Sequence, residues 1–391
     1  MVQSKAFMLI AGEASGDLLA AELAAALHEQ LPGARCFGAG GAQMAAAGVD
    51  LVLDLAQHAM IGVPTLQKLL ALRRTFSQLL ALAIERRPDV LIGVDYGGFN
   101  LRFGHAVKEY VRNNPFSKWN PKIVQFVSPQ VWASRPGRAR QIAADYDLLL
   151  SIFPFEKDWY ARRVPQLRVE FVGHPLVGRF AMDDLRRTRR PPETAPTAAR
   201  QSQILLLPGS RKSELNRHLP VMFQAAWQIV QKISAHFVCV LPDESLLALA
   251  KPLAVQSGWS NMIFQTGDLP RALAESEVAI SKTGTVTMEC AFFGVPAVTL
   301  YKTNWFTYQI GKRLVKVKSL TMPNLLADGE VYPEFIQHDA TPENLSRAAL
   351  ELLQDETRRQ TIQAQLAKII ASLGGPGAPK RAATAILSLF P

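Results

Sequence analysis

Short and almost uninterrupted apolar runs recur along this chain, separated by longer segments with helical periodicity. Strands that are buried on both faces, as in a parallel sheet covered by helices, have such runs, whereas half-exposed strands alternate apolar and polar residues. The pattern therefore predicts repeated βαβ units and parallel sheets. The predicted strands lie at residues 7–12, 34–41, 89–95, 122–128, 147–153 and 169–174, and then at 203–210, 235–242, 261–267, 278–284 and 296–302.

A segment rich in charge, proline and threonine separates the two sets of runs. Residues 182–203 contain few large apolar side chains, which favours a linker. The length of 391 residues also exceeds the size at which a single hydrophobic core usually stops growing. We therefore expect one α/β domain at residues 1–181 and a second at 204–371. The tail at 372–391 ends in an apolar helix, which we expect to cross back to the first domain or onto a partner subunit.

Two doubly wound, Rossmann-like domains of this kind are expected to face a cleft at the carboxyl ends of their strands, where open α/β sheets bind ligands. This arrangement is the GT-B fold. The glycine-containing segment at residues 38–48 lacks a GxGxxG motif that opens a first helix, so a dinucleotide site is not expected.

The net charge of +10 indicates an anionic partner: nucleic acid, acidic lipid headgroups or phosphorylated metabolites. The basic residues are scattered without aromatic residues along a groove, which argues against nucleic acid. Cys36, Cys239 and Cys290 are far apart in apolar surroundings, as in a reduced cytoplasmic protein. No run approaches the roughly 20 apolar residues of a transmembrane helix, and the first apolar run is short for a signal peptide. We expect a soluble or peripheral protein.

The first predicted strand runs into the turn AGEASGD, residues 11–17. Ser15 or Asp17 can cap the following helix, and such a turn can also bind an anionic or hydroxyl-rich ligand. Both readings stay open for Ser15. Glu13 has no capping duty in either, so we expect its carboxylate to face the cleft.

A nearly all-apolar strand ends at Asp95, within the motif GVDYGGFN. A carboxylate buried without partners at this position would cost several kcal/mol, so Asp95 should face the cleft. There it could act as the general base that activates a sugar hydroxyl. The alternative is a structural carboxylate that caps the next helix or binds loop amides.

Polar and aromatic side chains also follow the strand at residues 122–128. Ser128, Gln130 and Trp132 lie just after it, and three arginines come next. Tryptophan faces stack on sugar rings and arginines hold phosphate, so we expect these residues at the acceptor side or in the cleft. Alternatively, Trp132 packs between domains and the arginines form a solvated helix face.

In the second domain, a strand, a turn of small residues and a helix start follow one another in LLLPGSRKSEL. The amides of Gly209 and Ser210 at the helix start are expected to bind an anion, with Arg211 adding a charge-assisted contact to phosphate. The segment resembles a diphosphate cradle without the lysine of a P-loop.

A second strand-end turn, SKTGTVTMEC, places Gly284 and Thr285 at the start of a helix that carries Glu289 one turn later. Backbone and hydroxyl donors suit phosphate, and a carboxylate suits ribose hydroxyls, so the turn fits a UDP-sugar. An ordinary helix glutamate is the alternative for Glu289. Asn324, between Pro323 and two leucines, could read a uracil edge or a phosphate.

Taken together, these motifs resemble the lipid-A-disaccharide synthase family. The similarity covers nearly the whole chain in the expected order: AGEASGD, GVDYGGFN, VSPQVWA, FPFEK, FVGHP, LLPGSR, SKTGTVTMEC, KRLVK and MPNLLA. Members join UDP-2,3-diacylglucosamine to 2,3-diacylglucosamine 1-phosphate and release UDP. The resemblance implies that the first domain takes the acceptor and the second the UDP-sugar. It also implies an inverting reaction with no cofactor or metal, in the cytoplasm at the inner face of the inner membrane.

For single residues, the resemblance implies that Asp95 is the essential acidic residue, and that Arg211, Glu289 and Asn324 belong to the UDP site. One motif departs from the family pattern. Many members read roughly DAPDFN after the strand, whereas Gly97 and Gly98 stand here at the proline and second aspartate. The first aspartate is kept, but the rigidity of this loop and any role of a second carboxylate are in question.

The expected helix at residues 63–87 has a second reading in a protein with a lipid substrate. Arg73 and Arg74 flank an apolar edge, which could rest on an acidic membrane surface. An ordinary amphipathic core helix is the alternative. The expected core stripe is Leu69, Leu72, Phe76, Leu79, Leu80 and Ala83, and the residues that widen it are Leu66 and Leu70.

Two other functions remain open from the sequence. The chain could be another GT-B enzyme for a UDP-sugar, such as a peptidoglycan-type GlcNAc transferase or a UDP-GlcNAc 2-epimerase. It could also be a non-catalytic protein that binds membranes or nucleic acid by charge. A homodimer is left open as well.

Overall fold

The computed structural model describes residues 4–55, 66–180, 201–259, 262–315 and 317–390. It divides the chain into two compact units, which are described separately. Unit 1 consists of Met1–Gly178 with Leu373–Pro391, and unit 2 is Arg179–Ser372. Most of the expected linker, residues 182–200, lies outside the described residues. The first strand of unit 2 starts at Ser202, inside the range expected for the linker.

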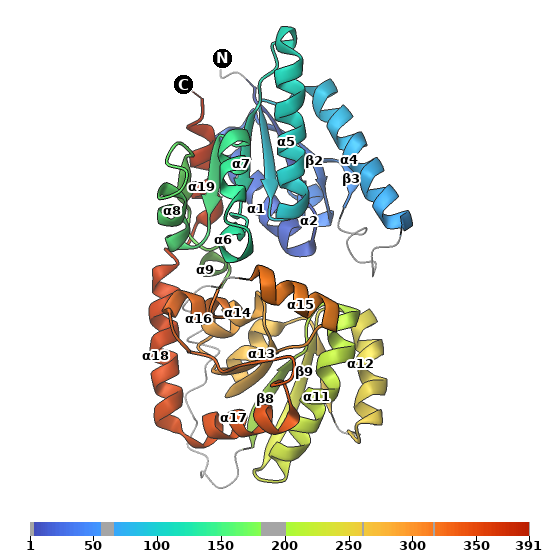
Figure 1. Cartoon of the computed structure of the whole chain (residues 1–391), viewed down its shortest axis with the longest axis vertical. Coiled ribbons are helices and arrows are strands. Elements are labelled where there is room, and N and C mark those ends of the chain that lie inside the picture. Colours follow the sequence, from blue (N-terminus) through green and yellow to red (C-terminus); the bar gives the residue numbers. More distant parts are fainter. Residues whose placement is uncertain (1–3, 56–65, 181–200, 260–261, 316, 391) are drawn as a thin grey trace. The chain divides into compact units, whose positions relative to one another are not determined.

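Unit 1 is built on a seven-stranded sheet in the order β3-β2-β1-β4-β5-β6-β7, and every pairing in it is parallel. Its strands are β1 (Ala6–Ala11), β2 (Arg35–Gly40), β3 (Asp50–Asp54), β4 (Val90–Val94), β5 (Lys122–Phe126), β6 (Leu148–Ser151) and β7 (Val169–Phe171). Its helices are α1 (Ala14–Gln30), α2 (Ala42–Ala46), α4 (Leu66–Arg86), α5 (Gly97–Asn113), the 3-10 turn η1 (Pro115–Ser117), α6 (Val131–Ser134), α7 (Arg138–Asp145), α8 (Pro154–Ala161) and α19 (Ala378–Leu387); α9 (Leu176–Arg179) ends at the boundary of the units (Figure 1).

Unit 2 repeats this plan with six parallel strands in the order β10-β9-β8-β11-β12-β13. Its strands are β8 (Ser202–Leu207), β9 (Ala235–Leu241), β10 (Ile263–Thr266), β11 (Val278–Lys282), β12 (Ala297–Tyr301) and β13 (Glu334–Ile336). Its helices are α11 (Lys212–Val230), α12 (Glu244–Gln256), α13 (Leu269–Glu275), α14 (Val286–Phe292), α15 (Trp305–Leu314), α16 (Met322–Ala327), α17 (Pro342–Gln354) and α18 (Glu356–Ser372).

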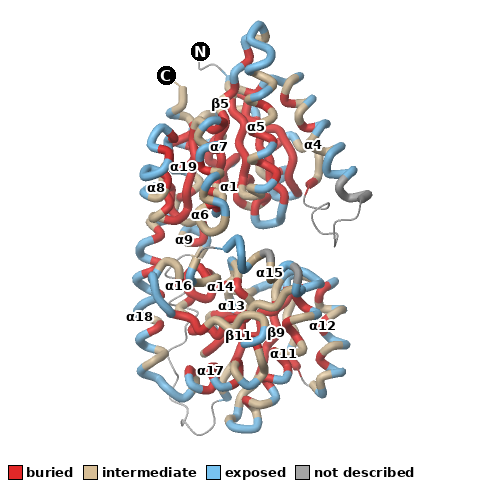
Figure 2. Tube along the Cα trace, in the orientation of Figure 1, coloured by how far each residue is buried: buried red, intermediate tan, exposed pale blue. Residues whose placement is uncertain are grey.

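The central strands of both sheets form the hydrophobic cores, which Figure 2 shows as the red traces inside each unit. All six residues of β1 and all five of β4 are buried, as expected for strands covered by helices on both faces. Each apolar run that predicted a strand overlaps one, and the fold class of two parallel α/β domains is confirmed. The edge strands β3 and β13 were not predicted.

The tail of the chain belongs to unit 1, where α19 packs against α1. Lys380 forms a 2.7 Å ion pair with Glu29, and the side-chain amide of Gln30 donates to the main-chain carbonyl oxygen of Lys380 at 2.9 Å. The closing helix thus covers the first helix of the same chain.

Helix α4 differs from its predicted core stripe. Leu79 and Ala83 are buried, and Phe76 and Leu80 pack partly buried against the core. Leu72, however, is 40% exposed, so its assignment to the core was wrong. Residues 63–65 and the side chains of Leu66 and Leu69 lie outside what is described. In the described ranges, no helix combines the length and the apolar character that crossing a membrane requires.

Candidate functional site

The order of strands places the expected site residues at equivalent points of the two sheets. In each sheet the first two crossovers run in one direction and later ones in the other, so the order reverses between β1 and β4, and between β8 and β11. Loops at the carboxyl ends of such neighbouring strands form the usual ligand site of open α/β sheets. The turns after β1 and β4 contain Glu13 and Asp95, and those after β8 and β11 contain Ser210 and Gly284.

Asp95 lies in an unusual backbone turn. Asp95 and Tyr96 both have left-handed conformations, with φ of +50° and +43°, between the end of β4 and the start of α5. Residues other than glycine rarely adopt this backbone conformation, and each one that does destabilises the fold by on the order of 1–3 kcal/mol. Strain of this kind concentrates at functional sites, and here it is found at the residue expected to act as the base.

Two buried side-chain amides donate hydrogen bonds to the main-chain carbonyl oxygen of Asp95. Asn100 Nδ2 donates to it at 2.9 Å and Gln125 Nε2 at 2.8 Å. Both side chains are almost completely buried. These bonds fix the peptide that follows Asp95 and therefore fix the direction of the strained turn.

The carboxylates of Asp95 and Glu13 interact across the β1 and β4 turns. Burial, followed by the negative charge of Glu13, raises the pKa of Asp95, while a hydrogen bond from the Tyr96 backbone opposes the shift. A raised pKa makes the carboxylate a better proton acceptor at neutral pH. Glu13 occupies the N-cap position of α1, but its side chain makes no capping bond.

The expected capping of α1 by Ser15 or Asp17 was wrong. Ser15 is an exposed residue of the first turn of α1. Asp17 is buried and caps α2 instead, because its Oδ1 accepts from the amide of Gly41 at 2.8 Å and its Oδ2 from that of Gln43 at 3.0 Å. The glycine-rich turn at 38–48 therefore has an internal carboxylate at its helix start, which agrees with the absence of a dinucleotide motif.

Gly12 serves a contact within the protein. A Cβ at this position would lie 2.4 Å from the Tyr96 ring. The glycine lets the aromatic ring beside Asp95 lie directly on the β1 turn.

The loop after β5 is organised by a buried glutamate that the sequence did not single out. Glu156, with no exposed surface, accepts a 3.0 Å hydrogen bond from the Trp132 indole and another from Ser128. Burial raises the pKa of Glu156 to about 7. Ser128 is itself buried and also bonds Tyr160, whereas Gln130 is exposed. Among the three expected cleft residues, Gln130 has the most accessible side chain.

In unit 2, the amide of Ser210 is engaged within the protein. It donates to Glu214 Oε2 at 3.0 Å, and Glu214 Oε1 pairs with Lys282 Nζ at 2.9 Å. The expectation of a freely exposed Ser210 amide was therefore wrong. The same contacts join the β8 and β11 turns and bring a cation to them, since Lys282 is the last residue of β11. Arg211, at the N-cap position of α11, is exposed.

A buried histidine one turn further along α11 supports these turns. His218 Nδ1 lies 2.7 Å from the carbonyl oxygen of Pro208, and Nε2 lies 3.1 Å from the amide of Lys302. Nδ1 must therefore carry the proton while Nε2 accepts, which is the neutral form of the ring. Burial lowers the pKa of His218, in agreement with this form.

The turn after β11 presents Gly284, Thr285 and Glu289. Thr285 is exposed at the start of α14, and Glu289 lies half-buried one turn later. Burial raises the pKa of Glu289, and the positive charge of Arg179 opposes the shift. Among the described residues no side chain is hydrogen-bonded to the Glu289 carboxylate, which leaves its oxygens suited to hydroxyl ligands.

Asn324 is not a candidate for direct contact with uracil. It is 2% exposed; its Nδ2 donates to the carbonyl oxygen of Tyr332 and to Glu334, both at 2.8 Å, and its Oδ1 accepts from the amides of Val331 and Tyr332. An asparagine amide has two donors and two acceptor sites, so its capacity is used up. Asn324 thus holds the segment that follows α16, and its place in the UDP site stays a prediction.

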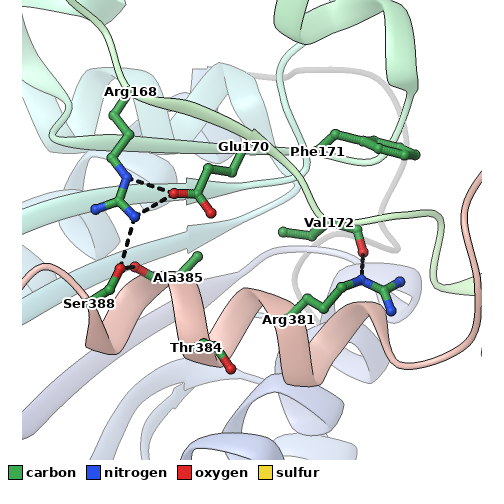
Figure 3. Close-up of a pocket in the computed structure, with 8 residues that line it drawn as sticks. All are labelled: Arg168, Glu170, Phe171, Val172, Arg381, Thr384, Ala385 and Ser388. Atoms are coloured by element: carbon green, nitrogen blue, oxygen red, sulfur yellow. Dashed lines mark hydrogen bonds and ion pairs between the residues drawn. The ribbon is translucent and has the colours of Figure 1, made fainter.

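A pocket in unit 1, between β7 and α19, is lined by none of the site residues predicted from the sequence (Figure 3). Arg168 pairs with Glu170 and donates to Ser388 at 2.8 Å, and Arg381 donates to the carbonyl oxygen of Val172 at 2.7 Å. Its charged groups thus attach the tail to the edge of the sheet. Within the described ranges, no group of three His, Cys, Asp or Glu side chains is placed to hold a metal ion.

Several of these supporting residues had a signal in the sequence. Gln125 interrupts an otherwise apolar strand, and a polar side chain buried in a sheet needs a specific partner. Asn100 and Glu156 lie inside the motifs GVDYGGFN and FPFEK. Lys282 and Glu214 lie inside the two motifs that predicted the nucleotide site, SKTGTVTMEC and LLLPGSRKSEL. Their pairing depends on which strands are neighbours, and the sequence does not give that order directly.

Solved structures with the same fold include glycosyltransferases and epimerases of UDP-sugars. S. aureus MnaA in a UDP co-structure has a TM-score of 0.63 at 12% identity over 99% of this chain and 98% of that chain. The calicheamicin glycosyltransferase CalG4 has 0.59 at 16% over 99% and 98%, and Acinetobacter baumannii MurG 0.55 at 16% over 98% and 99%. These similarities establish the GT-B fold.

Sequence relatives identify the family. The lipid-A-disaccharide synthase of Syntrophus aciditrophicus is 35% identical over 100% of this chain and 99% of the relative. That of Trichlorobacter lovleyi is 36% identical over 98% and 97%. A family model described as lipid-A-disaccharide synthetase matches residues 7–388. This chain therefore belongs to the lipid-A-disaccharide synthase family.

Proposed function

We propose that this chain condenses UDP-2,3-diacylglucosamine with 2,3-diacylglucosamine 1-phosphate, forming the lipid A disaccharide 1-phosphate and UDP. The family supports the overall reaction, and the GT-B fold supports a nucleotide-sugar donor. The observation that carries the chemistry is Asp95, a half-buried carboxylate with a raised pKa on a strained turn beside Glu13.

In the proposed reaction, Asp95 accepts the proton of the acceptor 6-hydroxyl as its oxygen attacks the anomeric carbon of the donor. The bond from that carbon to the UDP oxygen breaks, and its electron pair leaves with UDP. A single displacement of this kind inverts the anomeric configuration. General base catalysis typically contributes about 10²–10⁴-fold to the rate.

Unit 2 is proposed to bind the donor. The turns after β8 and β11 offer the exposed Ser210 side chain, Arg211, Gly284 and Thr285 to the diphosphate, while the Ser210 amide stays on Glu214. The Glu289 carboxylate suits ribose hydroxyls. Asn324 acts indirectly in this proposal, because its amide is saturated by its own segment. Unit 1 is proposed to bind the acceptor, with Glu13, Ser15 and Gln130 as exposed polar groups, and Ser128 and Trp132 held by Glu156.

We further propose that the protein works at a membrane surface, at the cytoplasmic face of the inner membrane. Leu70 and Leu72 on α4 are 48% and 40% exposed, beside the exposed cations Arg73 and Arg74. Arg73 and Arg74 lie three and four residues after Leu70, on the same face of the helix, and exposed leucines beside cations suit anionic lipid. Sedimentation with anionic and zwitterionic vesicles tests this, and the double variant Leu70→Glu/Leu72→Glu is expected to lose binding to the anionic vesicles.

The reaction is tested by incubating the protein with both lipid substrates and following UDP and disaccharide by mass spectrometry. UDP release that requires the acceptor is expected, and Asp95→Asn should reduce turnover by at least about 10²-fold. Asp158→Asn, a change of an exposed aspartate on α8, is the matched control and should keep full turnover. Epimerisation of UDP-GlcNAc without disaccharide formation would instead support the epimerase alternative.

A further inference from the structure

Lys282 lies where the proposed donor site needs a cation. It is the last residue of β11, and its neighbour Ser281 pairs in register with Leu207 at the end of β8. Because the two strands are parallel, their following turns start at the same edge of the sheet. Lys282 is therefore beside the turn that contains Ser210.

The Lys282 side chain is held by one carboxylate that also binds the neighbouring turn. Glu214 Oε1 lies 2.9 Å from Lys282 Nζ, and Glu214 Oε2 accepts from the Ser210 amide at 3.0 Å. The two charged side chains are only 18% and 11% exposed. Partial burial strengthens charge interactions compared with bulk water, so the ammonium group is well fixed.

Glycines in both turns allow this close arrangement. Gly209 has a φ of +125°, and a Cβ on it would lie 2.3 Å from Glu214 Oε2. Gly284 has a φ of +151°, and a Cβ on it would lie 3.3 Å from Lys282 Nζ. Side chains at these positions would displace the pair, so the glycines leave the ammonium group at the surface of the turns.

We propose that Lys282 binds the diphosphate of the nucleotide-sugar donor and that Glu214 is the positioning residue that orients it. This inference rests on the proposed function. A lysine ammonium has three N–H donors, and among the described residues Glu214 is the one side chain that accepts from it. Two N–H donors therefore remain for phosphate oxygens on a side chain that is 18% exposed. A lysine was not part of the cradle predicted from the sequence, which contained Arg211 as its cation.

The test compares UDP with uridine, which has the same base and ribose but no phosphate. Dissociation constants are measured by ligand-observed NMR titration of the full-length protein. Lys282→Met is expected to weaken UDP binding about 10- to 100-fold, as for loss of a charged hydrogen bond, and to leave uridine binding unchanged. Lys282→Arg is expected to retain most of the affinity. Lys251→Met, on the exposed face of α12, removes the same charge and should change neither constant.

A separate variant tests the positioning role of Glu214. Glu214→Gln keeps the acceptor for Ser210 but removes the charge that fixes Lys282, so UDP binding should weaken several-fold while uridine binding stays the same. If Lys282→Met fails to fold because it leaves Glu214 unpaired, the double variant Lys282→Met/Glu214→Gln removes both charges. It is expected to show the same selective loss of UDP.

Two results would overturn the assignment of Lys282: unchanged UDP affinity in a folded Lys282→Met or double variant, or a parallel loss of UDP and uridine, which indicates a purely structural lysine. Failure of the wild-type protein to bind UDP would overturn the proposed donor itself. The two failures are therefore distinguishable.

Discussion

The side-chain amide of Asn100 donates a 2.9 Å hydrogen bond to the main-chain carbonyl oxygen of Asp95. This bond closes the strained turn from inside the unit, together with the one from Gln125. The amide oxygens of both side chains are buried and have no hydrogen-bond partner among the described residues. An unsatisfied buried acceptor costs about 1–3 kcal/mol. The two side chains thus stabilise the Asp95 turn through their NH₂ groups, while their unpaired oxygens destabilise the folded state.

Replacing Asn100 should therefore affect both stability and chemistry. Asn100→Ala leaves the Asp95 carbonyl with the Gln125 donor alone, and we expect the free energy of unfolding to fall by about 0.5–1.5 kcal/mol, the net worth of a hydrogen bond. We also expect kcat to fall because the strained turn relaxes, while the dissociation constant of UDP stays the same. Urea denaturation and steady-state kinetics measure these effects. Asn114→Ala, which removes an exposed bond at the other end of α5, is the control. An unchanged kcat would argue against the positioning role.

The charge of Glu13 should set the pH dependence of the reaction. Asp95 acts as a base only when deprotonated, so activity falls as the pH drops through its raised pKa. Glu13→Gln removes a charge that raises the pKa of Asp95 and should move the acid limb of the kcat/KM profile to lower pH. Glu29→Gln, at the far end of α1, should leave the limb in place. An upward or absent shift in Glu13→Gln would contradict the interaction of the two carboxylates.

Gly98 stands where many family members have a second aspartate, and it has space around it. The effect of a carboxylate at this position can therefore be tested. Gly98 is exposed in the first turn of α5, and a Cβ there meets no atom within 4 Å. Gly98→Ala should raise the free energy of unfolding by about 1 kcal/mol through helix propensity. Gly98→Asp should also be tolerated, and its negative charge should move the acid limb to higher pH. If both variants give the same pH profile, a carboxylate at this position has no electrostatic effect on Asp95.

The central strands of each sheet were predictable from the sequence, and so was one edge strand of each, β7 and β10; the opposite edge strands, β3 and β13, were not. β1 and β4 are continuous apolar runs because helices cover both of their faces. β3 and β13 lie at the edges, have no buried residue and contain acidic residues, so they carry no such run.

The site was predictable where a polar residue ends an apolar strand, as Asp95 does. It was not predictable where a side chain's partners lie far along the chain. Asp17 caps α2, whose N-cap residue Gly41 lies 24 residues further along the chain, although its own helix is nearer in sequence. Asn324 looked free between apolar neighbours, but the following segment folds back and uses all of its hydrogen-bonding groups. The residue type shows which hydrogen bonds a side chain can make, and the tertiary contacts decide whether its groups remain accessible to a ligand.

The buried Glu156 predicts a pH-dependent stability of unit 1. Its pKa is raised to about 7 in the folded chain, compared with roughly 4.3 when unfolded. The folded state therefore favours the protonated carboxyl. The stability that this form supports is fully present below about pH 4.3 and is lost as the pH rises through about 7. Above that pH, a charged carboxylate remains buried against Trp132 and Ser128.

Glu156→Gln replaces this group by a neutral one of the same shape and removes the titration. Between about pH 5 and pH 8, the free energy of unfolding of the variant should rise relative to wild type, by up to about 3 kcal/mol at 1.36 kcal/mol per pKa unit. Urea denaturation at several pH values measures the difference, with the exposed Glu85→Gln as control. Because the Trp132 indole donates to Glu156, tryptophan emission should follow the same titration and lose it in Trp132→Phe. Parallel stability curves for wild type and Glu156→Gln would show that Glu156 keeps its charge over this range.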